Sequence, residues 1–290
     1  MKADLHVHTR FSDGSYTTAD AANTARRNGV THLGVVDHDT TAGLELAVAA
    51  GHRAGVEVIP GIEISAYDFR AGRKIHVLGY NLRPPARNVE ELCKPLRARR
   101  HLRTLEQIDI LSAAGYPVTE REVADLAAEG LSEAEREVWP AVLFKQHIMM
   151  VLVRKGYTSS IYGSLYHELF KGNGVCSGDI GYVDAHDAVA AVSADGGIPV
   201  LAHPGQQRSF DLAQELRSDG LRGVEVAHPD HTREDTRRAD QLALRLGLIR
   251  TGGSDDHGEF GSPCELGAIT APSIGAARIA ADRPDTTPRS

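Results

Sequence analysis

The sequence has few cysteines and aromatic residues and no strong excess of basic charge. Its three cysteines, Cys93, Cys176 and Cys264, lie far apart without a Cys-x-x-Cys pair. This spacing argues against a disulfide framework and against a thiolate zinc site. The formal net charge of −7 provides no broad basic surface, so an extended nucleic-acid duplex is not an expected partner.

Long apolar runs are also missing. The longest strongly apolar run near the middle, Ile148 to Val153, is far shorter than the roughly 20 residues needed to cross a bilayer. The N-terminal region carries His and Asp where a signal peptide needs an uninterrupted apolar segment. We therefore expect a cytoplasmic protein without a membrane span. At 290 residues with 41% hydrophobic residues, it can bury the core of one large domain or two smaller ones.

Short apolar segments alternate with helical stretches over much of the chain. Strands are predicted at 4–8, 31–36, 56–59, 198–202, 223–226 and 247–251, and helices at 17–28, 42–54, 185–194 and 233–246. Nearly continuous apolar strands are typical of a sheet covered on both faces, and the repetition indicates βα units. Long charged helices interrupt this pattern. We therefore expect a barrel formed by 1–81 and 175–275, a helical insert at 82–174 and a disordered tail at 280–290.

Imidazoles and carboxylates gather at these predicted strands. His6 and His8 lie two residues apart in the first strand, so both side chains point to one face. Similar groups end or follow later strands: Asp37, His38, Asp39, Glu63, His76, His203, His228, Asp255, Asp256 and His257. In parallel barrels such residues meet at the carboxyl face. A buried crowd of these groups is costly unless cations satisfy it, which predicts a site for several metal ions.

Taken in order, these motifs resemble the PHP (polymerase and histidinol phosphatase) family of metal-dependent phosphoesterases, in its nucleotidase-like branch. The matching segments are Asp4-Leu5-His6-Val7-His8, Ser12-Asp13-Gly14, Asp37-His38-Asp39, Gly61-Ile62-Glu63-Ile64, His76-Val77-Leu78-Gly79-Tyr80, Leu201-Ala202-His203-Pro204-Gly205 and Gly253-Ser254-Asp255-Asp256-His257. The resemblance implies an α/β fold, a distorted (βα)7 barrel with an inserted helical subdomain. It also implies two to three divalent ions, with Mn²⁺ as first candidate and Fe²⁺ or Zn²⁺ as alternatives.

The resemblance further implies which residues bind each ion. The first ion would be held by His6, His8, Glu63 and Asp255; the second by Glu63, His76 and His147; and the third by Asp13, His38 and His257. Relatives carry two arginines beside the counterpart of His147, whereas this chain has Lys145 and Met150. The candidates for substrate and phosphate binding are Arg208, Lys145, Lys171 and His228.

From this site we expect a phosphatase that hydrolyses a small phosphate monoester with a metal-activated water. The substrate would be a nucleoside 3′,5′-bisphosphate, a 5′-nucleotide or a sugar phosphate, selected by the helical insert acting as a lid. Glu63, which links two ions, and His203, as general acid, are the predicted catalytic residues; metal binding is the alternative role of His203. Two other functions stay open: a phosphodiesterase acting on a cyclic phosphate or an oligonucleotide end, and a non-catalytic metal-binding module. The oligomeric state also stays open.

Overall fold

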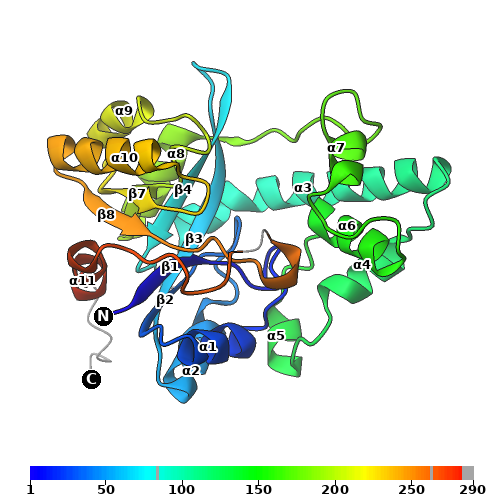
Figure 1. Cartoon of the computed structure of the whole chain (residues 1–290), viewed down its shortest axis with the longest axis horizontal. Coiled ribbons are helices and arrows are strands. Elements are labelled where there is room, and N and C mark those ends of the chain that lie inside the picture. Colours follow the sequence, from blue (N-terminus) through cyan, green and yellow to red (C-terminus); the bar gives the residue numbers. More distant parts are fainter. Residues whose placement is uncertain (83–84, 262–263, 283–290) are drawn as a thin grey trace.

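A sheet of eight strands forms the centre of the protein (Figure 1). The computed structural model describes residues 1–82, 85–261 and 264–282. Seven strands follow one another in the order β1 (Ala3–Val7), β2 (His32–Val35), β3 (Glu57–Asp68), β4 (Arg73–Tyr80), β6 (Ile198–Leu201), β7 (Gly223–Ala227) and β8 (Ile249–Gly252), and β5 (Val183–Asp184) pairs with β3 beside this path. A bridge between Val7 and Asp256 nearly closes the ring. The predicted α/β barrel of seven strands is confirmed.

One strand runs against the others. β4 is antiparallel to both β3 and β6, because the turn from Asp68 to Arg73 is too short for the crossover that parallel neighbours require. The other strand pairs of this sheet are parallel. The first half of β4 therefore lies at the rim where the parallel strands end. His76 reaches that rim from the start of an antiparallel strand, and not from a strand end as the sequence pattern suggested.

Helices cover the outside of the barrel. They are α1 (Thr18–Arg27), α2 (Leu44–Ala54), α8 (Ala185–Ala194), α9 (Leu212–Ser218), α10 (Arg233–Leu246) and α11 (Ser273–Ala281), with a short 3-10 helix, η1, at Gly258–Phe260. The ends of the predicted helices shift slightly. For example, α1 begins at Thr18 because Thr17 is its cap: the Thr17 hydroxyl accepts a hydrogen bond from the Asp20 amide at 3.1 Å, and the Asp20 carboxylate accepts one from the Thr17 amide.

Five helices between β4 and β5 form a unit on one side of the barrel (Figure 1). They are α3 (Arg87–Ala113), α4 (Glu120–Ala127), α5 (Glu133–Val138), α6 (Lys145–Arg154) and α7 (Ser164–Phe170). Their apolar side chains, including Leu111, Val123 and Leu152, form a core of their own that also includes Phe260 after β8. The first half of α3 instead packs on the barrel core through Val89, Cys93 and Leu96. The helical unit is thus fixed to the barrel through the first half of α3 and through Phe260.

Parts of the predicted boundaries lie outside the described residues. Residues 83–84 of the predicted entry to the insert and residues 283–290 of the predicted tail are among them, whereas residues 280–281 of that tail end α11. Within the described ranges, no helix combines the length and apolar character needed to cross a membrane.

Close contact between β1 and β2 fixes the strand that carries His6 and His8. A Cβ atom added at Gly34 would lie 2.4 Å from the Leu5 carbonyl oxygen and 2.7 Å from the Leu5 Cα. Because these are backbone atoms, β1 itself would have to move. We expect Gly34→Ala to lower the free energy of unfolding by about 1–3 kcal/mol, measured from denaturant midpoints by circular dichroism.

Gly181→Ala is the matched control for this substitution. A Cβ at Gly181 would meet only the Arg99 side chain, at 3.6 Å and 3.9 Å. Equal midpoints for the two variants would contradict the assigned role of Gly34.

Candidate active site

Four buried atoms at the barrel rim form the first candidate ion site. His6 Nε2 and His8 Nε2 each lie 3.2 Å from Asp255 Oδ1, and they lie 3.3 Å and 3.2 Å from Glu63 Oε2. None of the four atoms has a hydrogen-bond partner among the described residues. A tetrahedron with metal–ligand bonds of about 2.0 Å has edges of about 3.3 Å. The spacing therefore fits one divalent ion, and the set is the one that the resemblance implied.

The other oxygen of Glu63 contacts two further imidazoles. Glu63 Oε1 lies 2.8 Å from His76 Nδ1 and 2.8 Å from His203 Nε2. His38 joins Glu63 and His76 in a second group whose ligand atoms lie within 4.8 Å of one another. Burial alone would raise the pKa of Glu63, but His76, His38 and the other imidazoles hold it well below its ordinary value. Glu63 is therefore ionised at the centre of these groups.

His203 is better placed to bind metal than to donate a proton. Its ring is buried, and its Nε2 faces Glu63. Burial lowers the pKa of His203 more than the contact with Glu63 raises it, which favours the neutral imidazole that metal ions require. His203 also lies close enough to His228 and Asp255 to form another group of possible ligands.

The structure does not bring His147 to Glu63 and His76. The His147 ring lies between Phe144 and Phe260, with ring centroids 5.8 Å and 5.6 Å away. Its Nδ1 accepts a hydrogen bond from the Phe144 amide at 3.1 Å. Among the described residues, His147 belongs to none of the groups that could hold an ion.

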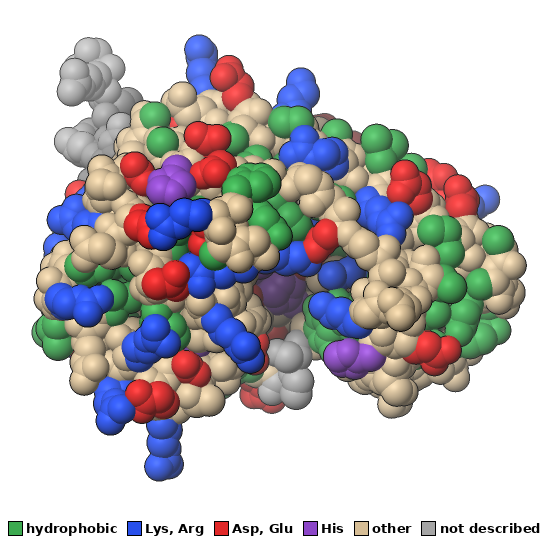
Figure 2. All heavy atoms as spheres, turned by 90° about the horizontal axis from the view of Figure 1, so that it is seen from above, with side chains coloured by type: hydrophobic (Ala, Val, Ile, Leu, Met, Phe, Trp, Pro, Cys, Tyr) green, Lys and Arg blue, Asp and Glu red, His purple; other side chains and the backbone are tan. Residues whose placement is uncertain are grey.

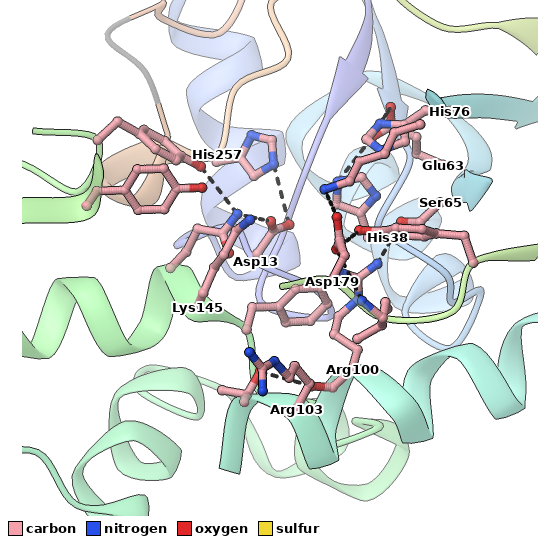
Figure 3. Close-up of a pocket in the computed structure, with 18 of the residues that line it drawn as sticks. Asp13, His38, Glu63, Ser65, His76, Arg100, Arg103, Lys145, Asp179 and His257 are labelled. Atoms are coloured by element: carbon pink, nitrogen blue, oxygen red, sulfur yellow. Dashed lines mark hydrogen bonds and ion pairs between the residues drawn. The ribbon is translucent and has the colours of Figure 1, made fainter. Parts of the chain in front are cut away.

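The third predicted set is brought together, with His8 beside it. Asp13, His38, His257 and His8 each offer a ligand atom, all within 4.8 Å of one another. His257 Nε2 lies 3.4 Å from Asp13 Oδ1 (Figure 3), and that oxygen has no hydrogen-bond partner among the described residues. An unpaired buried oxygen facing an imidazole again fits a cation between them.

Glu225 supports these ligands, although the sequence analysis did not assign it to the site. It is fully buried in β7. Its Oε1 contacts His6 Nδ1 at 3.0 Å, and its Oε2 accepts a hydrogen bond from the His203 amide at 2.8 Å. The signal was a carboxylate in the middle of an apolar strand, where an unpaired charge is costly. Burial would lower the pKa of His6, but the Asp255, Glu225 and Glu63 carboxylates raise it well above its ordinary value.

A cavity of about 480 Å³ extends from the metal groups to the helical unit. In Figure 2 the hollow between the two parts of the surface has Lys and Arg side chains around it, with a histidine at its floor. The cationic side chains that line the cavity are Lys74, Arg100, Arg103, Lys145 and Lys171.

Two of these cations have no carboxylate partner. Lys74 pairs with Asp179, and Arg100 donates to Asp39 at 2.9 Å. Lys145 and Lys171 each lie 5.6 Å from the centre of the Tyr166 ring, and the described residues provide no ion pair for either lysine. Burial, together with Lys74 and Arg100 nearby, lowers the pKa of Lys145 to about 8. The cavity therefore combines possible metal sites with two cations free to bind an anion.

The remaining two predicted substrate contacts lie elsewhere. Arg208 is exposed and does not line the cavity; instead Gln206 and Gln207 line it, and the Arg208 carbonyl accepts a hydrogen bond from Arg73 at 2.6 Å. His228 is buried, with its Nε2 3.2 Å from Asp255 Oδ2. It therefore lies against the metal groups.

A barrel whose rim gathers ionised carboxylates and imidazoles beside a cationic cavity defines a metal-dependent phosphoesterase, and this chain is a hydrolase of that class. The model of the PHP domain matches residues 4–183, and the chain belongs to the PHP family. Family membership confirms the resemblance drawn from the motifs.

Individual relatives are similar over nearly the whole chain. The phosphoribosyl 1,2-cyclic phosphate 1,2-diphosphodiesterase of Eggerthella lenta is 46% identical over 267 residues, which cover 92% of this chain and 98% of that protein. The 3′,5′-nucleoside bisphosphate phosphatase of Chromobacterium violaceum is 29% identical, covering 88% of this chain and 86% of that protein. A crystal structure from Bifidobacterium adolescentis, assigned as a metal-dependent phosphoesterase, superposes with a TM-score of 0.87 at 29% identity, covering 98% and 97% of the two chains.

Glu63 belongs to two of the groups that could hold an ion, so its replacement should lower the number of bound ions. Glu63→Gln keeps the shape but removes the charge, and its amide NH₂ cannot bind a cation. We expect the purified variant to carry at least one ion per chain fewer than the natural protein, measured by elemental analysis after dialysis. Glu225→Gln, which changes a neighbour of the ligands, should keep the number of ions and weaken their affinity about 10–100-fold. A Glu63→Gln protein with unchanged metal content and affinity would argue against the central place of Glu63.

Proposed function

We propose that this chain hydrolyses a phosphate ester of a small molecule that carries a second anionic group. The observation that carries this proposal is the presence of Lys145 and Lys171, both without a carboxylate partner, in the same cavity as the metal groups. A cavity of about 480 Å³ lies within the range of about 300–1,000 Å³ common for small-molecule sites. It suits a sugar bisphosphate or a mononucleotide.

We assign three divalent ions to the rim. The first is held by His6, His8, Glu63 and Asp255 and the third by Asp13, His38 and His257, and in each set the ligand atoms lie within 4.8 Å of one another. The second is held by Glu63 with His76 and His203, because a ring nitrogen of each histidine lies 2.8 Å from Glu63 Oε1. His203 thus takes the place expected for His147 and is no longer a candidate general acid. Mn²⁺ is the first candidate, because sites of imidazole and carboxylate accept it. When bound, such ions lower the pKa of a coordinated water and neutralise charge on the phosphoryl oxygens.

The protein's own side chains then orient the substrate. Lys145 at the start of α6 and Lys171 after α7 bind the second anion where the helical insert lines the cavity. Both ammonium groups lie 5.6 Å from the centre of the Tyr166 ring, a distance at which the ring attracts a cation. All three residues belong to the helical insert at 82–174, which supports the proposal that the insert selects the substrate.

The named substrates of two relatives share this feature. Phosphoribosyl 1,2-cyclic phosphate and a nucleoside 3′,5′-bisphosphate each contain two phosphate groups. We place the cyclic diester of a phosphorylated sugar first, since the relative named for it is 46% identical over 92% of this chain. The monoester of a nucleoside bisphosphate is the second candidate. The first candidate corresponds to the phosphodiesterase alternative, and the second to the phosphomonoesterase expected from the motifs.

A substrate panel distinguishes these candidates. We expect hydrolysis with added Mn²⁺, measured as ring opening for the cyclic diester and as release of phosphate or of a nucleotide for the others, to be fastest with phosphoribosyl 1,2-cyclic phosphate. It should be slower with nucleoside 3′,5′-bisphosphates, and slowest with simple 5′-nucleotides and 5′-phosphorylated oligonucleotides. Measured kcat/KM values give the order. Activity on none of them, with metal bound, would instead support the non-catalytic module.

The two free lysines provide a sharper test. We expect Lys145→Ala and Lys171→Ala each to lower kcat/KM for the preferred two-phosphate substrate about 10–100-fold, since a charge-assisted hydrogen bond contributes about 1.5–3 kcal/mol. Hydrolysis of p-nitrophenyl phosphate, which has a single phosphate, should change little. Lys94→Ala, an exposed lysine of α3 outside the cavity, is the control. An equal decrease in kcat/KM on both substrates would show that the lysines do not bind a second anion.

A further inference from the structure

Asp13, a candidate ligand of the third ion, is held by a side chain from the helical insert. Gln146, the second residue of α6, has its Nε2 2.8 Å from Asp13 Oδ2. A carboxylate accepts hydrogen bonds and donates none, so the amide nitrogen must face it. The same nitrogen lies 3.2 Å from the Tyr162 hydroxyl, in the segment before α7. The amide is thus held between Asp13 of the barrel and Tyr162 of the insert.

The contact leaves the other Asp13 oxygen for a different partner. Asp13 Oδ1 faces His257 Nε2 at 3.4 Å and has no hydrogen bond within the described residues. Asp13 is only 2% exposed, so an unpaired oxygen at this position is costly unless a cation binds it. Gln146 therefore turns the carboxylate so that one oxygen is bonded and the other is directed at the third group.

Within residues 1–82, 85–261 and 264–282, the first group has no comparable link to the insert. His6 is fixed by Glu225 from β7, and the four atoms of its group come from β1 and the residue after it, from β3, and from the residues after β8. In the third group, His257 is held within the barrel by the Asp255 carbonyl at 2.9 Å. Asp13 is the ligand whose position depends on a residue 133 positions away in the insert.

We propose that Gln146 is a positioning residue that directs Asp13 Oδ1 at the third ion, so that the affinity of this ion depends on the helical insert while that of the first does not. The proposal rests on the metal assignment made under Proposed function. When the hydrogen bond between Gln146 and Asp13 is broken, the third ion should therefore be the one that is lost. Gln146 also lines the substrate cavity. The same side chain can therefore affect the binding of this ion and the binding of substrate.

The test is a metal titration of the full chain, stripped with a chelator and titrated with Mn²⁺ by calorimetry, with elemental analysis of the dialysed protein. Gln146→Met keeps the volume and removes the donor, and Gln146→Ala removes the side chain. In both variants we expect one ion to bind about 10–100-fold more weakly and the others to bind as before. Gln206→Ala is the matched control, since Gln206 lines the same cavity but donates to Asp230 at 2.6 Å.

The possible outcomes separate the two proposals. If Gln146→Met melts at the natural temperature and binds every ion with natural affinity, the positioning role is wrong. It is also wrong if the variant binds all the ions with equally reduced affinity, or if the natural protein binds only the first and second ions. If the natural protein binds no Mn²⁺, Fe²⁺ or Zn²⁺, the metal assignment itself fails, and the positioning role fails with it.

Discussion

The burial of an ionised Glu63 among imidazoles is the constraint on which the site depends. A carboxylate removed from water loses several kcal/mol of hydration unless charges or donors replace the water, and here His6, His8, His38, His76 and His203 surround it. Several of their nitrogen atoms have no partner of their own. Divalent ions between these atoms would bind the imidazole nitrogens and the carboxylates together, and in our proposal metal binding therefore contributes to the stability of the barrel rim as well as to its chemistry.

The fold serves this centre through two departures from a regular barrel. The antiparallel β4 brings His76 to the rim beside Glu63, and the long segment that follows β4 forms the helical unit that walls the cavity. The proposed ion sites lie on the barrel, next to a unit with a separate apolar core. In our proposal the barrel provides the chemistry and the helical unit selects the substrate, and the contact of Asp13 with Gln146 joins the two.

The sequence could predict the role of a residue where a local pattern determines the position of its side chain, and not where tertiary contacts determine it. The alternation of His6 and His8 in a strand, and the acidic and imidazole groups after other strands, predicted a site for metal ions. The order of these motifs along the chain carried the family resemblance, which implied the seven-stranded barrel and the proposed ligands. The choice between His147 and His203 was not predictable, because it depends on whether α6 turns the His147 ring toward Glu63 or toward Phe144 and Phe260. Tertiary contacts also explain two further differences from the sequence analysis. Arg208 was predicted to bind phosphate, but its loop leaves the side chain exposed. Glu225 was not predicted, because its contact with His6 depends on how the strands pack.

The most direct test of the ion-centred site is a crystal structure of the protein grown with Mn²⁺, with anomalous diffraction data collected at the manganese edge. The structure predicts a strong anomalous peak about 2.0–2.2 Å from Glu63 Oε2, His6 Nε2, His8 Nε2 and Asp255 Oδ1, with further peaks at the second and third groups. An electron-density map with no anomalous peak at the rim, and with the imidazoles hydrogen-bonded directly to the carboxylates, would contradict it.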